Sequence, residues 1–150
     1  MSSSNVGQVL PVSAFSYSVS LRVRHPTLDL SVLTDLLRLE PAHRWTAGEP
    51  RRSQSGSPLG GVHRDSYWSA PLPAQMIGPN SMPLELFFGQ QVLQLSRHRD
   101  ALRKLREDGG EISLLVELSP VANSSLTISS TTAGKLADLN IEVEFQFIGD

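Results

Sequence analysis

The sequence has no cysteine among its 150 residues. A disulfide framework, a cysteine nucleophile and a zinc–thiolate cluster are therefore excluded, and a reducing compartment is favoured. The chain also lacks any run approaching the roughly 20 apolar residues that a membrane helix requires. Residues 1–13 have no basic start of the kind that opens a secretion signal. We therefore expect a cytoplasmic protein with no membrane partner.

Basic residues are nearly absent from the C-terminal part of the chain. Residues 1–106 hold 12 of the 13 Lys/Arg against 7 acids, whereas residues 107–150 hold one lysine against 8 acids. The formal charges of the two parts are therefore +5 and −7, although the whole chain carries only −2. Such polarity could steer an acidic partner to one surface. The simpler interpretation, which we favour, is that the two parts face one another inside the fold.

The composition is that of one globular domain, with 39% hydrophobic and 19% charged residues. A chain of this length buries roughly 70% of its unfolded surface, so its own core is large enough for folding. Residues 1–13 are rich in small polar residues without periodicity, which predicts a flexible N-terminal arm. We expect a single domain over residues 14–150.

Residues 15–23 alternate strictly between apolar and polar, which predicts a half-buried strand that ends at His25 and Pro26. Asp29 is expected to cap a helix that runs to Leu39. Similar patterns predict helices over residues 84–95, 101–105 and 130–139, and strands over residues 43–47, 66–69, 112–118, 126–129 and 141–148. In the last helix, Ser130 is expected to be the cap and Asn140 the left-handed exit. Residues 48–64, with four glycines and two prolines, are expected to form a long loop.

This order of elements predicts an α+β fold. We expect a largely antiparallel sheet with helices on one face, built from a ferredoxin-like βαββαβ core and a C-terminal β-α-β extension. The other face of the sheet would carry Arg22, Arg24 and the serines of the first strand. That face would be open to solvent or to a partner.

Several short motifs give the chain a family resemblance. The first strand is followed by a leucine-rich segment ending at Pro41, then by Trp45, the tripeptide 48–50, a glycine-rich segment and Trp68. In this order the chain resembles the domain-of-unknown-function 4279 family over roughly residues 14–148. The resemblance implies a small bacterial α+β domain with no established activity. It supplies no catalytic residues.

The candidate site surrounds the expected loop. Arginine guanidinium groups bind phosphate or carboxylate through two parallel hydrogen bonds, and aromatic rings can stack on a base. The residues proposed to bind a ligand or partner are Arg44, Trp45, Glu49, Arg51, Arg52, Arg64 and Trp68. The structural alternative makes Trp45 and Trp68 core residues on paired strands, with Glu49 pairing with an arginine across the loop. We favour this structural alternative.

Two functions remain open. The leading one is a non-enzymatic binding or protein-interaction module, such as a toxin-neutralising or accessory protein, that contacts its partner through residues 48–64. The alternative is an enzyme or sensor for a small anionic or nucleotide-like ligand in a pocket between Trp45 and Trp68. A homo-oligomer is compatible with either function.

Other chemistries find little support in the sequence. No nucleophile elbow, phosphate loop or dinucleotide fingerprint is present, so we expect no catalytic residue and no cofactor. His43, Glu49, His63 and Asp65 lack the spacing of a metal site, so no metal is expected either. The basic run over residues 97–106 could contact nucleic acid. We expect it instead to be solvated or to meet Glu142 and Glu144, so nucleic acid is not an expected partner.

Overall fold

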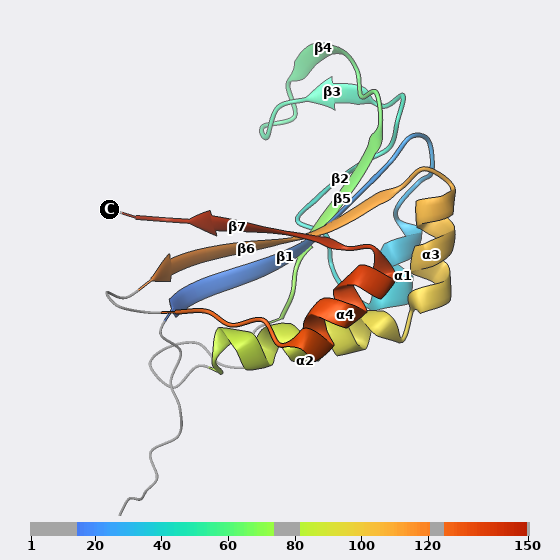
Figure 1. Ribbon diagram of the computed structural model, residues 1–150. Coiled ribbons are helices and arrows are strands. Elements are labelled where there is room, and N and C mark those ends of the chain that lie inside the picture. The colour runs from blue at the N-terminus through green and yellow to red at the C-terminus, as the bar shows by residue number, and fades with distance from the viewer. Residues whose placement is uncertain (1–14, 74–81, 121–124, 150) are drawn as a thin grey trace, which may run out of the picture.

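The computed structural model describes residues 15–73, 82–120 and 125–149. The predicted arm, residues 1–13, lies outside these ranges. The elements in chain order are β1 (Phe15–His25), α1 (Val32–Leu37), β2 (His43–Trp45), β3 (Pro50–Arg52), β4 (Pro58–Val62), β5 (Ser66–Pro71), α2 (Leu84–Ser96), α3 (Arg99–Glu107), β6 (Glu111–Pro120), α4 (Ser130–Leu139) and β7 (Glu142–Phe147) (Figure 1). No helix in the described ranges is long and apolar enough to cross a membrane.

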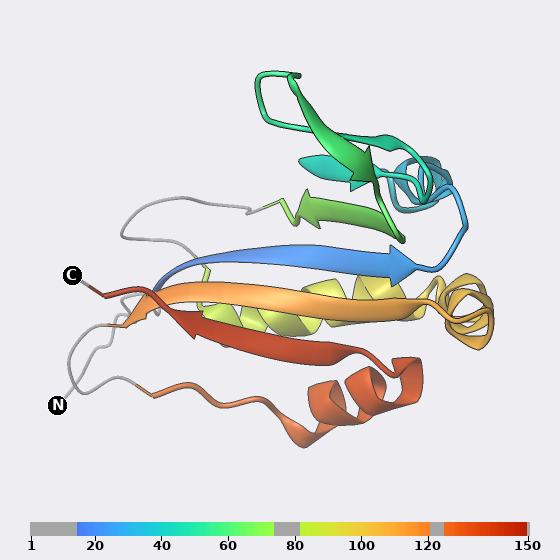
Figure 2. The same cartoon turned by 90° about the horizontal axis from the view of Figure 1, so that it is seen from above.

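Five strands form the main sheet in the order β2-β5-β1-β6-β7. β1 lies at the centre and is antiparallel to both of its neighbours, β5 and β6. β2 is antiparallel to β5, and only β7 pairs in parallel, with β6. The helices lie on one side of this sheet, as the two views show (Figures 1 and 2). The predicted α+β class is therefore confirmed.

The finer prediction of a ferredoxin-like core is not fully confirmed. In sequence order, the first four strands of the main sheet are β1, β2, β5 and β6, and they lie in the order β2-β5-β1-β6. That arrangement is compatible with a βαββαβ unit. However, a separate two-stranded sheet, β3-β4, interrupts the unit between β2 and β5. The chain then adds α4 and the parallel strand β7 beyond β6.

The predicted long loop over residues 48–64 is wrong, because this segment contains the β3–β4 hairpin. Every residue of the two hairpin strands is exposed. A strand that is exposed to solvent on both faces needs no alternation of apolar and polar residues. The alternation by which strands are usually predicted is therefore missing. Pro50 and Pro58 each stand at the first position of a strand, where a proline is tolerated.

Three smaller expectations also change. Asp29 does not cap a helix directly: its carboxylate accepts a hydrogen bond from the Ser31 N–H at 2.9 Å, and α1 begins at Val32. Residues 126–129 form no strand. α4 is capped by Ser129, one residue earlier than predicted, whose hydroxyl accepts from the Thr132 N–H. The predicted left-handed exit at Asn140 is confirmed by its φ of 56°.

The core lies between the sheet and the helices. Alternate β1 residues, Val19, Leu21 and Val23, point into it. The largest fully buried side chain is Trp68 on β5, whose indole Nε1 donates to the Thr34 hydroxyl of α1 at 3.1 Å. This bond satisfies the one polar atom of the ring, so Trp68 joins β5 to α1 without leaving an unpaired donor.

His25 ends β1 in a buried turn. Its Nδ1 accepts hydrogen bonds from the N–H groups of Thr27 and Leu28, at 3.1 and 2.8 Å. Its proton therefore lies on Nε2, which is 2.9 Å from the Asp108 carboxylate. The prediction that the first strand ends at His25 is confirmed, and the ring also ties the end of β1 to the turn between α3 and β6.

We expect Trp68→Ala to lower the free energy of unfolding by about 3–5 kcal/mol, because it leaves a large cavity in the core. Chemical denaturation measures this change. Leu86→Ala, at a side chain that is 54% exposed on α2, is the control and should change stability by less than about 0.5 kcal/mol. A similar loss in both variants would contradict the core role of Trp68.

Candidate functional site

The face of the sheet opposite the helices is polar, and its register aligns side chains into rows across the strands. One row runs from β2 to β6 through Trp45, Tyr67, Arg24 and Glu111. The next row runs from β2 to β7 through His43, Ser69, Arg22, Ser113 and Glu142. The expectation that Arg22 and Arg24 lie on the face away from the helices therefore agrees with the register. Their neighbours in each row depend on strand pairing and were not predicted.

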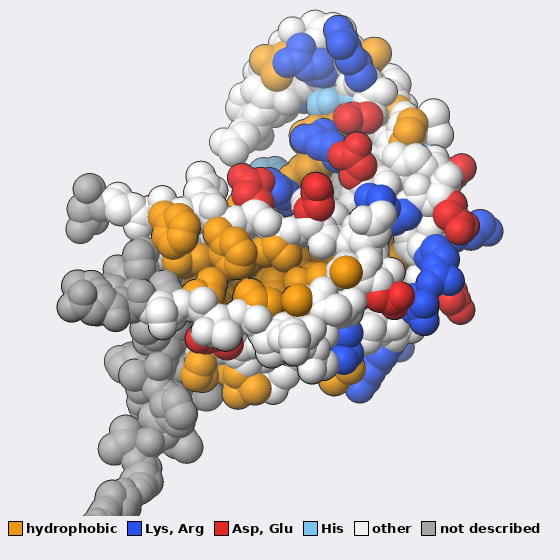
Figure 3. Space-filling view, in the orientation of Figure 1, with side chains coloured by type: hydrophobic (Ala, Val, Ile, Leu, Met, Phe, Trp, Pro, Cys, Tyr) orange, Lys and Arg blue, Asp and Glu red, His pale blue; other side chains and the backbone are white. Residues whose placement is uncertain are grey.

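Opposite charges are interleaved on this open face. Arg22 donates to Glu144 at 2.7 Å and to the Ser113 hydroxyl at 3.3 Å. Arg24 lies 3.5 Å from the Asp65 carboxylate, with its guanidinium 4.6 Å from the centre of the Tyr67 ring. The space-filling view shows acidic and basic side chains together below the hairpin (Figure 3). Most of the charge on this face is therefore neutralised locally.

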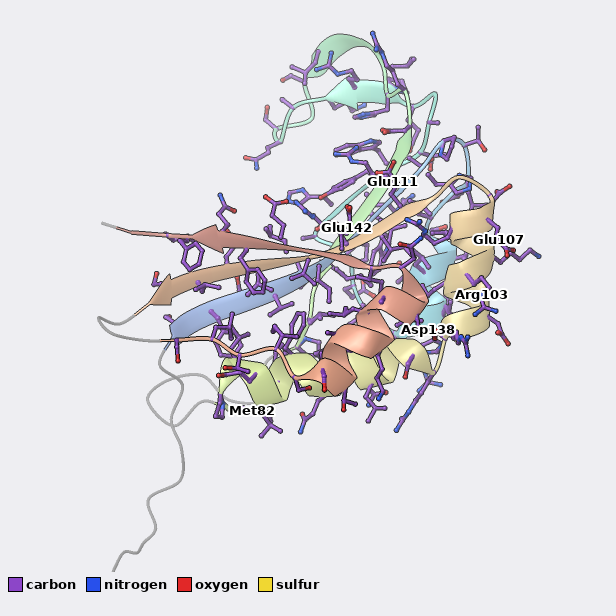
Figure 4. The ribbon with its side chains drawn as sticks, viewed as in Figure 1. Met82, Arg103, Glu107, Glu111, Asp138 and Glu142 are labelled. Atoms are coloured by element: carbon purple, nitrogen blue, oxygen red, sulfur yellow. The ribbon has the colours of Figure 1, made fainter. Side chains whose placement is uncertain are left out.

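A hollow of about 1030 Å³ opens on this face near the starts of β6 and β7. Its charged lining consists of three arginines and three glutamates: Arg22, Arg24, Arg106, Glu111, Glu142 and Glu144. Glu111 and Glu142 lie on the side of the sheet that faces the hairpin (Figure 4). Because the two signs balance, the hollow does not favour an anion over a cation.

An aromatic stack fixes the base of the hairpin. The Trp45 and His63 rings are nearly parallel, with centroids 4.3 Å apart. The Tyr67 ring is tilted by 31° relative to Trp45, and the centroids of these two rings are 4.8 Å apart. These rings join β2 and β5 to the end of β4. The Trp45 Nε1 atom is buried and has no hydrogen-bond partner among the described residues. Trp45 is therefore a half-buried anchor of the hairpin.

Glu49 holds the turn that leads into the hairpin. Its carboxylate accepts a hydrogen bond from the Thr46 N–H at 2.7 Å. Backbone bonds between Gly48 and His63 and between His63 and Glu49 close the hairpin base, at 2.9 and 3.0 Å. Gly48 has a φ of 89°, which favours glycine. The expected pairing of Glu49 with an arginine is thus replaced by a bond to the backbone.

Three exposed arginines lie on the hairpin and just after it: Arg51 and Arg52 on β3, and Arg64 in the bend between β4 and β5. Arg52 donates to the Gly56 carbonyl at 3.3 Å, across the hairpin loop. Within the described ranges, no acidic side chain lies at ion-pair distance from any of the three. Leu59 and Val62 on β4 are each 54% exposed. The hairpin surface is therefore basic and also carries exposed apolar side chains.

The remaining two predicted site residues lie elsewhere. Trp68 points into the core, while Trp45, which pairs with Tyr67, lies on the open face. The two tryptophans therefore do not face a common pocket. Arg44, opposite Trp68 in the register, approaches Asp29 at 3.6 Å. The Ser31 backbone N–H lowers the pKa of Asp29 below its ordinary value, and the Ser31 hydroxyl and Arg44 act in the same direction.

The basic run of α3 meets α4 rather than β7. Arg99 lies 3.1 Å from Asp138, and Arg106 donates to the side-chain oxygen of Asn140. Figure 4 shows Arg103, Glu107 and Asp138 on this side of the molecule. The run was expected either to be solvated or to meet Glu142 and Glu144. Solvation agrees with the exposure of Arg97, Arg99, Arg103 and Lys104, whereas Glu144 is reached by Arg22 of β1.

Metal ligands do not gather in the described part of the chain. No group of three or more His, Asp or Glu side chains lies close enough together to hold a metal ion there. Three of the four residues considered for such a site have structural contacts of their own. His63 stacks on Trp45, Glu49 binds the turn, and Asp65 lies beside Arg24.

Comparison with known proteins identifies the family. The family model described as "Domain of unknown function (DUF4279)" matches residues 15–149. The chain belongs to this family, as its tryptophans and glycine-rich segment indicate. No curated protein and no solved structure shows significant similarity to it.

We expect Glu49→Ala to loosen the hairpin without unfolding the domain. The variant leaves the Thr46 N–H without its acceptor, so amides in residues 48–64 should exchange hydrogen faster. Global stability should fall by no more than about 1 kcal/mol, because the lost bond is exposed. Hydrogen exchange measured by mass spectrometry tests this. Glu49→Gln, which retains an acceptor oxygen, is the control, and equal exchange in all three proteins would contradict the role of Glu49.

Proposed function

We propose that this protein is a non-enzymatic binding module that contacts another protein through the β3–β4 hairpin. The proposal rests on one observation: the hairpin is held in place at its base, yet its strand residues are all exposed to solvent. Hydrogen bonds and stacked rings fix its base, yet none of its strand residues contributes to the core. A fixed arm that buries nothing in its own domain is well suited to bury surface against a partner.

The chemistry of the hairpin indicates the kind of partner. Arg51, Arg52 and Arg64 supply unopposed positive charge, while Leu59 and Val62 supply apolar area. Arginine is enriched at protein interfaces, where its planar group pairs with carboxylates and its stem packs on apolar surface. We therefore expect a protein partner with an acidic surface and an apolar patch between the acids. A toxin neutralised by this domain would be one such partner.

The alternative, a small anionic or nucleotide-like ligand, has less support from the geometry. The expected pocket would need Trp45 and Trp68 on one side of the sheet, and they lie on opposite sides. The hollow on the open face pairs its three arginines with three glutamates. An anion would therefore gain little net attraction there.

The Arg51→Glu/Arg52→Glu double variant tests the proposed surface. Tagged full-length protein is used to capture partners, and each candidate is then purified and its binding measured directly. Charge reversal on the hairpin should weaken binding about tenfold or more and slow association, because charges at an interface steer the encounter. The effect should diminish as salt is raised.

Arg103→Glu/Lys104→Glu is the matched control, with the same charge change at exposed positions of α3. It should leave partner binding unchanged. Equal binding by wild type and both variants would reject the hairpin as the contact surface. A rise in melting temperature with phosphate or a nucleotide, retained in the hairpin variant, would favour the alternative.

A further inference from the structure

β7 is an edge strand whose outer side pairs with no other strand in the described part of the chain. It pairs with β6 in parallel and without a register shift, from Ser113–Glu142 to Leu118–Phe147. Its sequence, EVEFQF, contains no proline or lysine. Natural edge strands are commonly protected by proline, lysine, bulges or short length. The other edge of the sheet, β2, has only three residues.

The hydrogen-bonding direction of each β7 residue follows from one observed bond. The Ile148 N–H donates to the Leu118 carbonyl at 2.8 Å, so Ile148 faces β6. In a parallel ladder, alternate residues direct both backbone groups to the same neighbour. Glu144 and Gln146 therefore also face β6. Val143, Phe145 and Phe147 direct their N–H and C=O groups outward, where a further strand would pair.

The two faces of β7 differ in chemistry. Glu142 and Glu144 lie on the open face, whereas Val143, Phe145 and Phe147 point to the helix side. Phe147 remains 67% exposed, and Val143 and Phe145 are only partly buried. Leu126 and Ile128, from the segment that leads into α4, are also partly buried. Figure 3 shows hydrophobic side chains gathered between β7 and that segment.

The space beside β7 limits the size of its occupant. Figure 2 shows residues 125–129 and α4 outside β7, beyond the edge of the sheet, and Figure 1 shows them at the level of the helices. Two copies joined through β7 by a two-fold axis would keep their helices on the same side. The α4 helix of each copy would then have to occupy the space on the helix side of the other copy's sheet, where that copy's own α4 lies. A single extended segment brings no helix with it and avoids this overlap.

We infer that the β7 edge is a second binding site, which takes an extended peptide segment as a sixth strand of the main sheet. The segment would alternate apolar residues, packed beside Val143, Phe145 and Phe147, with basic residues on the open face. The carboxylate available to those basic residues is that of Glu142, because Glu144 already binds Arg22. Strand addition of this kind draws affinity from backbone hydrogen bonds and specificity from alternate side chains. This site lies at the opposite edge of the sheet from β2 and is independent of the hairpin.

A six-residue peptide of alternating lysine and valine, blocked at both ends, is the probe, and the full-length protein is the target. In the free protein, the amides of Val143, Phe145 and Phe147 should exchange hydrogen faster than those of Glu144 and Gln146. Saturating peptide should slow the three outward amides about tenfold or more. Nuclear magnetic resonance resolves each amide. Outward amides already protected in the free protein would show that another segment or a second copy covers the edge, and would overturn the inference.

Two control peptides test the recognition chemistry. In antiparallel pairing, the valines opposite Val143, Phe145 and Phe147 direct their N–H groups to β7. The same peptide N-methylated at its valines therefore cannot donate to β7 and should not bind. A peptide of alternating glutamate and valine should bind about tenfold more weakly than the lysine peptide, because like charges would lie side by side. Equal binding by the N-methylated peptide would exclude strand pairing. Equal binding by the glutamate peptide would overturn the proposed basic chemistry.

Variants separate this site from the hairpin. Glu142→Lys should weaken the lysine peptide about tenfold and strengthen the glutamate peptide. Glu40→Lys, the same change at an exposed residue before β2, should alter neither. Arg51→Glu/Arg52→Glu should bind the lysine peptide as wild type does, so failure at the hairpin and failure at β7 give different results. Loss of peptide binding in the hairpin variant would contradict an independent site.

Discussion

The pairing of β1 with both β5 and β6 is the interaction on which the rest of the structure depends. β1 hydrogen-bonds to β6 along most of its length and to β5 over its second half. Its strict alternation sends Val19, Leu21 and Val23 to the helices and Ser18, Ser20 and Arg22 to the open face. Each neighbouring strand must match this arrangement, because a slip of one residue would exchange core and solvent faces.

The two edges of the sheet follow from this arrangement. On one side, β2 is short and is continued by a turn into the projecting hairpin, where Trp45, His63 and Tyr67 fix the base. On the other side, β7 pairs with β6 without a register shift and has no strand on its outer side in the described structure. It has an acidic face and an apolar face. The domain therefore presents a basic arm at one edge and an acidic, strand-shaped surface at the other. The basic and acidic parts of the chain meet between these edges, where Arg22 pairs with Glu144, and at α4, where Arg99 pairs with Asp138.

The family gives the chain its relatives but no activity, so function has to be argued from these surfaces. Compensated charges on the open face provide a weak basis for selective binding of an anion, since each favourable contact lies beside an opposing charge. Uncompensated groups are more informative. They are the arginines and aliphatic side chains of the hairpin and the outward backbone groups of β7. Another polypeptide can pair with the arginines, cover the aliphatic side chains and hydrogen-bond to the backbone groups.

The sequence by itself determined the elements with a strong local period, including β1, β6, the paired helices α2 and α3, and the capped helix α4. It also determined that Arg22 and Arg24 lie on the face away from the core, because the alternation of side chains along one strand does not depend on its neighbours. Tertiary structure alone decided that residues 48–64 contain a hairpin. A strand exposed to solvent on both faces has no periodic pattern of apolar residues by which its sequence could predict it. It alone placed Trp45 and Trp68 on opposite sides and Arg22 beside Glu144. Those outcomes depend on strand register, which is set by backbone bonds and packing between residues far apart in the chain.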